Sequence, residues 1–279
     1  MGRLTRVVVY PRDIRVFRNF GPEAIRRPRT KAQQEAKRGA ITRLSNKSRF
    51  DAFLHVSNSG EWPFMATVNF GSVAPTDGKE VKRCLDRLLT WLVRRGNSIF
   101  WRLEFTISCR PHFHLLLKHA ANETSMRVKW VSILGVPATR NLLKLETVRK
   151  PESLAGYLSK PDYQAWVPEE FKNVGRFWGY RGLESKLKIL LAVNGPEAAA
   201  APIVRAAKKV RERKSGRKVS DDGVTGKKLY KCGGEAMAIH VKQLAAEHGL
   251  EIEEPESRQT ATKRNRKKKK PAATVLKGR

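Results

Sequence analysis

The chain has 279 residues, a formal net charge of +31 and a pI near 10.6, so we expect a polyanion as its partner. Nucleic acid is the first candidate, and its binding should weaken with salt because neutralised phosphates release counterions. No stretch approaches the roughly 18 apolar residues of a membrane-spanning helix, so no membrane partner is expected. Cys84, Cys109 and Cys232 follow no disulfide or zinc-site spacing, which argues against both and favours a reducing compartment.

Composition divides the chain into three parts. Residues 1–49 are basic and broken by proline and glycine, which predicts a loosely packed or DNA-tracking N-terminal arm. Dense apolar periodicity over about 62–191 predicts a folded domain at 50–195. Residues 196–279 hold basic and acidic runs that cannot bury much surface, and they predict a basic, largely disordered tail with a short helix near 235–248.

Within the predicted domain, hydrophobic periodicity and turn residues indicate elements in the order β-α-β-β-α-β-α. In chain order we expect a strand over 64–70, a helix from Asp77 to near Gly96, strands over 100–106 and 111–117, a helix over 125–134, a strand over 142–148 and a helix over 151–160. This order predicts an α+β fold, with helices packed on one face of a mainly antiparallel central sheet.

The run Pro111-His112-Phe113-His114 places two imidazoles on an apolar strand. Because side chains alternate along a strand, His112 and His114 point the same way, about 7 Å apart. Glu104 lies on the polar face of the preceding strand, and an antiparallel hairpin would bring it beside both histidines. One carboxylate and two imidazoles would hold Mg²⁺ or Mn²⁺ with open positions for phosphate oxygens and water. The alternative is that both imidazoles are ordinary surface or hydrogen-bonded side chains.

A second chemical feature lies in the helix over 151–160, where Tyr157 and Lys160 are spaced to share one face. A tyrosine hydroxyl has a pKa near 10 and is a poor nucleophile. An adjacent cation and a metal-polarised phosphate together would let it attack. The alternative is that Tyr157 is an amphipathic packing residue and Lys160 a solvated charge at the helix end.

Taken together, the two motifs resemble those of the HUH endonucleases, in which a metal-binding His-hydrophobe-His strand precedes a Tyr-x-x-Lys helix. More narrowly, the chain looks like the replication initiators of rolling-circle replicons in small bacteriophages and mobile elements such as plasmids. The resemblance covers about Ile41 to Leu183 and includes the runs 64–70, 101–105, 111–114, 157–160 and 167–179.

The resemblance implies a role for each matching residue. His112 and His114 would be metal ligands, with Glu104 as the third, Tyr157 would be the nucleophile, and Lys160 would orient it or steady the charge around the phosphate. The enzyme would nick single-stranded DNA at a replication origin, form a 5′-phosphotyrosine link and release a 3′ hydroxyl for a host DNA polymerase. A separate host helicase and a location in the bacterial cytoplasm are implied as well.

One position departs from the family pattern. Some relatives carry a second active tyrosine four residues before the first, where this chain has Ser153. Closing the DNA circle would then need a second subunit in a dimer, a water molecule or another tyrosine. Tyr163 is nearby, but Pro161 should displace it from the helix face, so we expect it to be non-catalytic.

Basic residues outside these motifs are candidates for DNA contact. Arg176, in the run Gly-Arg-Phe-Trp-Gly, would bind a phosphate while a neighbouring aromatic ring stacks on an unpaired base. The favoured alternative is that Phe177 and Trp178 pack in the domain core. In the lysine run near the C-terminus, Lys267 and Lys268 would tether DNA non-specifically, although such a run is also typical of a nuclear-import signal.

Two function classes therefore stand. The first is a metal-dependent, site-specific DNA endonuclease and strand transferase that initiates rolling-circle replication, with conjugative relaxases and tyrosine transposases as near neighbours. The second is a non-catalytic, basic nucleic-acid-binding protein in which the histidines and Tyr157 are structural. The joint order of the motifs favours the enzyme, because a simple binding protein has no need of them.

Overall fold

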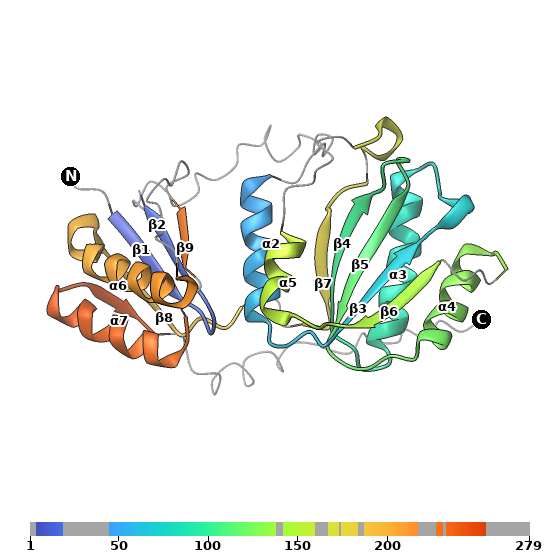
Figure 1. The fold of residues 1–279 in the computed structure, drawn as a ribbon. Helices are drawn as coiled ribbons and strands as arrows, with labels where there is room; N and C mark the ends of the chain where they lie inside the picture. Colours follow the sequence, from blue (N-terminus) through green and yellow to red (C-terminus); the bar gives the residue numbers. More distant parts are fainter. Residues whose placement is uncertain are drawn as a thin grey trace, which may run out of the picture.

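The computed structural model describes residues 4–18, 45–137, 142–159, 167–172, 174–183, 187–216, 227–230 and 233–254. Two five-stranded antiparallel sheets dominate this part of the chain (Figure 1). Sheet A has the strand order β10-β8-β1-β2-β9, and sheet B has the order β6-β3-β5-β4-β7. The predicted α+β class with antiparallel sheets is confirmed.

Sheet B contains the predicted central strands and one strand that was not predicted. Its members are β3 (Phe64–Asn69), β4 (Ile99–Phe105), β5 (Pro111–Leu117), β6 (Leu143–Thr147) and β7 (Trp178–Arg181). The helices that connect or flank them are α3 (Gly78–Val93), α4 (Glu123–Leu134) and α5 (Pro151–Leu158), with short 3-10 turns at η2 (Gly71–Val73) and η3 (Glu169–Phe171). The predicted order β-α-β-β-α-β-α is thus confirmed for β3 to α5.

Local signals explain why these elements begin where they do. The Asp77 side chain accepts a hydrogen bond from the Glu80 amide at 3.2 Å and caps α3, and Asn122 caps α4 in the same way through the Ser125 amide at 2.8 Å. Pro151 is the first residue of α5. Its missing backbone N–H costs nothing there, because the first N–H groups of a helix have no partner within the helix. Each helix therefore has a start encoded in its own sequence.

The main core of sheet B lies between the strands and the helices α3 and α4. Side chains from alternate strand positions, such as Val68, Leu103 and Phe113, meet the apolar stripe of α3 and are fully buried. Helices cover the other face as well, because Phe100 and Leu116 point that way and pack under α5 and under α2 (Asn46–Asn58). The expectation that helices cover only one face is therefore incomplete. Figure 1 shows α2 and α5 side by side, between sheets A and B.

Sheet A corrects the expectation of a loosely packed N-terminal arm. Its first two strands are β1 (Leu4–Val9) and β2 (Ile14–Arg18), and Val7 and Ile14 are fully buried. β1 pairs with β8 (Leu191–Pro196), the segment that ends the predicted 50–195 domain. The arm is ordered here because apolar residues of β1 pack in a sheet whose next strand, β8, lies about two thirds of the chain length further along the sequence. The rest of the predicted arm up to residue 44 lies outside the described residues.

The C-terminal part of the chain completes sheet A, which corrects the expectation of a largely disordered tail for residues 197–216 and 235–254. The elements are α6 (Glu197–Ser215), β9 (Lys227–Tyr230), α7 (Glu235–Glu247) and β10 (Glu251–Glu253). Ile203 and Ala207 of α6 and Val241 and Ala245 of α7 are fully buried against the strands. The predicted helix near 235–248 is present as α7. No helix among the described residues is both long enough and apolar enough to cross a membrane.

Polar contacts attach α2 to sheet A. The Asn58 amide donates to Asp13 at 2.7 Å, and its oxygen accepts from the Arg12 backbone N–H at 2.9 Å. Arg15 forms an ion pair with Asp51 at 3.1 Å. Since the opposite side of α2 packs on α5, this one helix links both sheets.

Candidate metal centre

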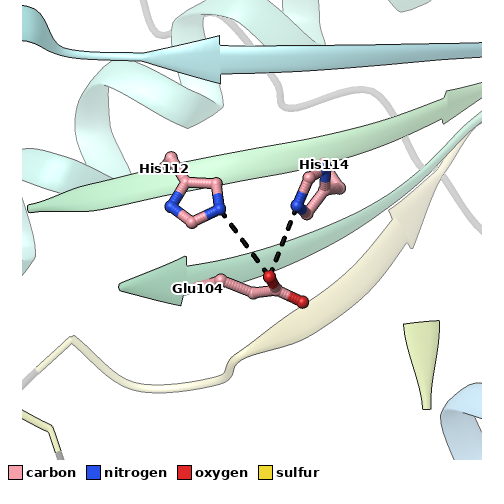
Figure 2. A group of neighbouring side chains, drawn as sticks. All are labelled: Glu104, His112 and His114. Atoms are coloured by element: carbon pink, nitrogen blue, oxygen red, sulfur yellow. Dashed lines mark ion pairs between the residues drawn. The ribbon is translucent and has the colours of Figure 1, made fainter. Parts of the chain in front are cut away.

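Glu104, His112 and His114 come together on the face of sheet B that is turned toward α5. In the antiparallel register, Glu104 of β4 lies directly opposite His112 of β5. The Nε2 atoms of His112 and His114 lie 3.7 and 3.3 Å from the same oxygen of Glu104, as Figure 2 shows. The ligand atoms of the three residues all lie within 4.8 Å of one another, and among the described residues no other such cluster of three occurs. The predicted convergence is confirmed.

The hairpin between β4 and β5 sets this geometry. Residues 106–110 close the loop, with the Thr106 amide donating to the Arg110 carbonyl at 2.9 Å and Cys109 in the left-handed region at φ 62°. A shift of register by one residue would turn both imidazoles into the apolar core on the other face. The buried Phe113 between them prevents such a shift, because it fills that core.

The charge of Glu104 is stabilised from two sides. Burial alone would raise its pKa, but the contacts with both imidazoles and the positive charge of Arg102 outweigh burial and hold the pKa well below its usual range. Arg102 Nε lies 2.8 Å from the second carboxylate oxygen, and the Arg102 side chain is almost fully buried. The cluster therefore presents an ionised carboxylate oxygen to the two Nε2 atoms.

A further contact orients one of the imidazoles. His114 Nδ1 lies 3.3 Å from the hydroxyl of Thr67 on β3, the strand on the other side of β5. In the tautomer with a proton on Nδ1, that nitrogen donates to Thr67 and Nε2 is left free to bind a cation. The Nδ1 atom of His112 is buried and has no hydrogen-bond partner.

The three residues fit a divalent cation. Metal bonds of about 2.1 Å at right angles to each other put ligand atoms about 3 Å apart, close to the separations of 3.3 and 3.7 Å found here. Imidazole nitrogen and carboxylate oxygen are donors that divalent metals accept. Three protein ligands leave coordination positions for other oxygen atoms. The arrangement can thus hold a metal ion and present it to a substrate.

Tyr157 of α5 lies beside this cluster. Its ring centroid is 6.0 Å from that of His114, with the two rings nearly perpendicular, and 43% of the residue is exposed. Leu154, Ala155 and Leu158 of α5 are buried against sheet B and α2, whereas Tyr157 stays partly exposed. Burial and the nearby Glu104 carboxylate raise the pKa of Tyr157, while Arg102 lowers it.

Three predicted site residues, Lys160, Lys267 and Lys268, lie outside the described residues. Tyr163, which we expect to be non-catalytic, lies outside them as well. Ser153, where the resemblance of the motifs would place a second tyrosine, is exposed, and its hydroxyl donates to the Lys150 carbonyl at 3.0 Å.

The structure does not bring Arg176 into the cluster. Arg176 is exposed, and its carbonyl accepts a hydrogen bond at 2.5 Å from Lys82 of α3, the helix on the opposite face of the sheet. Phe177 is buried in the core, and the ring of Trp178 stacks on that of Phe100, with the ring centroids 5.6 Å apart. Packing of these two aromatic residues, which the sequence favoured, is confirmed. A DNA contact by Arg176 stays a prediction.

Two contributors to the site were missed by sequence analysis. The strand pattern places Arg102 on the same face as Glu104. It does not predict that the Arg102 side chain donates a hydrogen bond to the C-terminal end of α5. Thr67 alternates with buried residues in β3, yet its distance to His114 depends on strand pairing. Both residues needed the tertiary structure to be recognised.

Comparison with known proteins identifies no relative of this chain. No family model, no curated protein and no solved structure matches it significantly. The geometry of the site and the resemblance of its motifs are therefore what point to a function.

Proposed function

We propose that the chain is a metal-dependent DNA endonuclease of the HUH type that initiates rolling-circle replication. The observation that carries the proposal is the position of Tyr157, a partly exposed residue of α5, whose ring lies beside the Glu-His-His cluster. A general binding protein needs neither the three convergent ligands nor a tyrosine next to them. The net charge of +31 supports a nucleic-acid substrate.

Glu104, His112 and His114 would hold Mg²⁺ or Mn²⁺, which when bound supplies positive charge to polarise the scissile phosphate. The Tyr157 oxygen attacks the phosphorus, a Tyr–O–P bond forms, and the bond from phosphorus to the 3′ oxygen breaks. Tyr157 gives up one proton and the departing 3′ oxygen takes one up, so the step is balanced. The products are a 5′-phosphotyrosine link and a 3′ hydroxyl that a host DNA polymerase can extend.

The electrostatics of the described residues explain why a cation is needed. The pKa of Tyr157 is raised by burial and by the charge of Glu104, so the side chain stays a neutral phenol at ordinary pH. Attack on the phosphate requires the opposite change, a lower pKa of Tyr157 that favours its ionised form. A divalent cation in the cluster offsets the charge of Glu104, and Lys160 would add a second positive charge.

The substrate of the proposed reaction is single-stranded DNA at an origin, opened by a host helicase. Because only one tyrosine stands on α5 at the proposed position, the second cleavage would need a nucleophile from a second subunit, from water or from another tyrosine. The 3′ hydroxyl that this cleavage frees would then attack the phosphotyrosine, close the circle and release Tyr157. A bacterial cytoplasmic location and the tether role of Lys267 and Lys268 belong to the same proposal.

The test is to incubate the protein with a labelled random-sequence single-stranded DNA library and Mn²⁺, and then to resolve covalent adducts on a denaturing gel. We expect an adduct with the wild type, and none with Tyr157→Phe or in the presence of a chelator. Tyr163→Phe is the matched control and should form the adduct normally.

An adduct that persists in Tyr157→Phe would remove Tyr157 as the nucleophile. If no adduct forms with any sequence while salt-sensitive DNA binding is intact, the protein is a non-catalytic binder.

A further inference from the structure

Arg102 joins the metal ligands to the helix that carries Tyr157. It is 2% exposed and lies on β4, two positions before Glu104 on the same face of the strand. Its Nε forms the ion pair with Glu104 Oε1, and its Nη1 donates a hydrogen bond to the backbone carbonyl of Leu158. One planar guanidinium therefore contacts both a candidate metal ligand and the residue that follows Tyr157.

The carbonyl that Arg102 binds lies at the C-terminal end of α5. The last carbonyls of a helix have no partner within the helix and carry partial negative charge, so cations stabilise them. A second arginine contributes there, since Arg49 of α2 donates through Nε to the Ser159 carbonyl at 2.8 Å. Arg49 thus holds the same helix end as Arg102, but its hydrogen bond comes from α2 and not from the strand that carries Glu104.

We propose that Arg102 is a positioning residue that couples cation binding at Glu104, His112 and His114 to the order of the last turn of α5. The role of Tyr157 in this coupling rests on the proposed function, whereas the coupling itself does not. Arg102 occupies Glu104 Oε1, so the other oxygen, Oε2, is the one that faces the imidazoles. A cation that fixes the carboxylate through Oε2 also fixes Arg102, and Arg102 in turn fixes the Leu158 carbonyl.

Thermodynamic linkage makes this coupling reciprocal. If the cation orders the last turn of α5, then stabilising that turn must raise the affinity for the cation, by at most the coupling energy. Lysine cannot replace Arg102, because a single ammonium lacks the fixed fork that reaches both partners. Arg49 is the matched control, because losing it loosens the helix end without breaking the link to Glu104.

The experiment measures amide hydrogen exchange of residues 155–159 with and without saturating Mn²⁺, in the absence of DNA. In the wild type we expect Mn²⁺ to slow this exchange about threefold or more. Arg102→Lys should still bind Mn²⁺, with the protection lost. Arg49→Lys should exchange faster in both conditions, with the protection factor retained.

A gentler variant covers the case in which Arg102→Lys fails to fold. Gly156 lies within α5, and a Cβ built there meets nothing within 4 Å, so Gly156→Ala should stiffen the helix without a clash. The coupling predicts a rise of up to about fivefold in Mn²⁺ affinity, which corresponds to about 1 kcal/mol of added helix stability.

The proposal is overturned if Mn²⁺ gives the wild type no protection, if Arg102→Lys retains the protection, or if Gly156→Ala leaves the Mn²⁺ affinity unchanged. None of these measurements contains DNA or requires turnover. A failed adduct assay would therefore contradict the proposed nuclease and leave the coupling intact, and the reverse also holds.

Discussion

Sheets A and B have the same architecture, yet the cluster of candidate metal ligands lies on only one of them. Each sheet has five antiparallel strands, packs two helices on one face and turns the other face toward α2. Each also carries an arginine and carboxylate pair on that second face: Arg6 with Glu253 at 2.6 Å in sheet A, and Arg102 with Glu104 at 2.8 Å in sheet B.

The difference lies in the neighbours of the two carboxylates. Glu253 is accompanied by Asn194 and lies largely in solvent, whereas Glu104 is half-buried beside two imidazoles. Solvent screens the first pair, and the exclusion of water strengthens the second. The two sheets therefore share one architecture, and the side chains around the carboxylate determine which of them has a candidate metal site.

The largest expected effect concerns the cores, in which the two sheets should behave alike. Leu103 of sheet B and Ile14 of sheet A are both fully buried. Replacing either with alanine should lower the free energy of unfolding by about 2–5 kcal/mol, through lost burial and the cavity left behind. Chemical denaturation followed by circular dichroism measures this change.

Because α2 packs on both sheets, we expect both variants to shift one shared transition. Two separate transitions, of which only one moves in each variant, would contradict this structural link.

The next effect separates the two carboxylates. Glu104→Gln should weaken Mn²⁺ binding about tenfold or more, because an ionised ligand is replaced by a neutral amide. Glu253→Gln is the matched control on sheet A and should leave the Mn²⁺ affinity unchanged. Isothermal titration calorimetry gives both values, with melting curves to verify that each variant is folded.

Equal losses in the two variants would mean that Mn²⁺ binding reports general surface charge, and the assignment of Glu104 as a ligand would fail.

The smallest effect depends on pH and concerns α2, between the sheets. His55 stacks on Tyr180 of β7 at 4.5 Å, and burial lowers its pKa from 6.5 even though Asp51 opposes that shift. As the pH falls from about 6.5 toward the lower pKa of the folded state, His55 is protonated in the unfolded chain before it is protonated in the folded chain. His55 therefore contributes stability above about pH 6.5 that is lost on acidification.

His55→Phe keeps an aromatic ring in the stack but cannot titrate. The free energy of unfolding of this variant should fall less between pH 7 and pH 5 than that of the wild type, as urea denaturation at each pH would measure. Identical pH profiles would show that His55 is not part of this dependence.

Much of sheet B and of its metal cluster could be predicted from the sequence, because their signals are local. Caps at Asp77 and Asn122 define helix starts, and the period of two in side-chain direction along a strand defines which residues of β4 and β5 share a face. A five-residue loop joins those two strands, so Glu104 could meet His112 in few ways other than the register observed.

Only the tertiary structure determined the rest. β1 pairs with β8, so strands from the first 18 residues join strands from beyond residue 190, and the short apolar runs of β1, β2 and β9 look like parts of basic tails when taken alone. In the same way, no pattern in α5 or β4 indicates that Arg102 reaches the Leu158 carbonyl. That Tyr157 lies beside His114 was implied only by the resemblance of the motifs, and no local signal gives it. The physical reason is that caps, turns and alternation act between neighbours in the sequence, whereas burial and long-range pairing stabilise a segment only when its distant partner is in place.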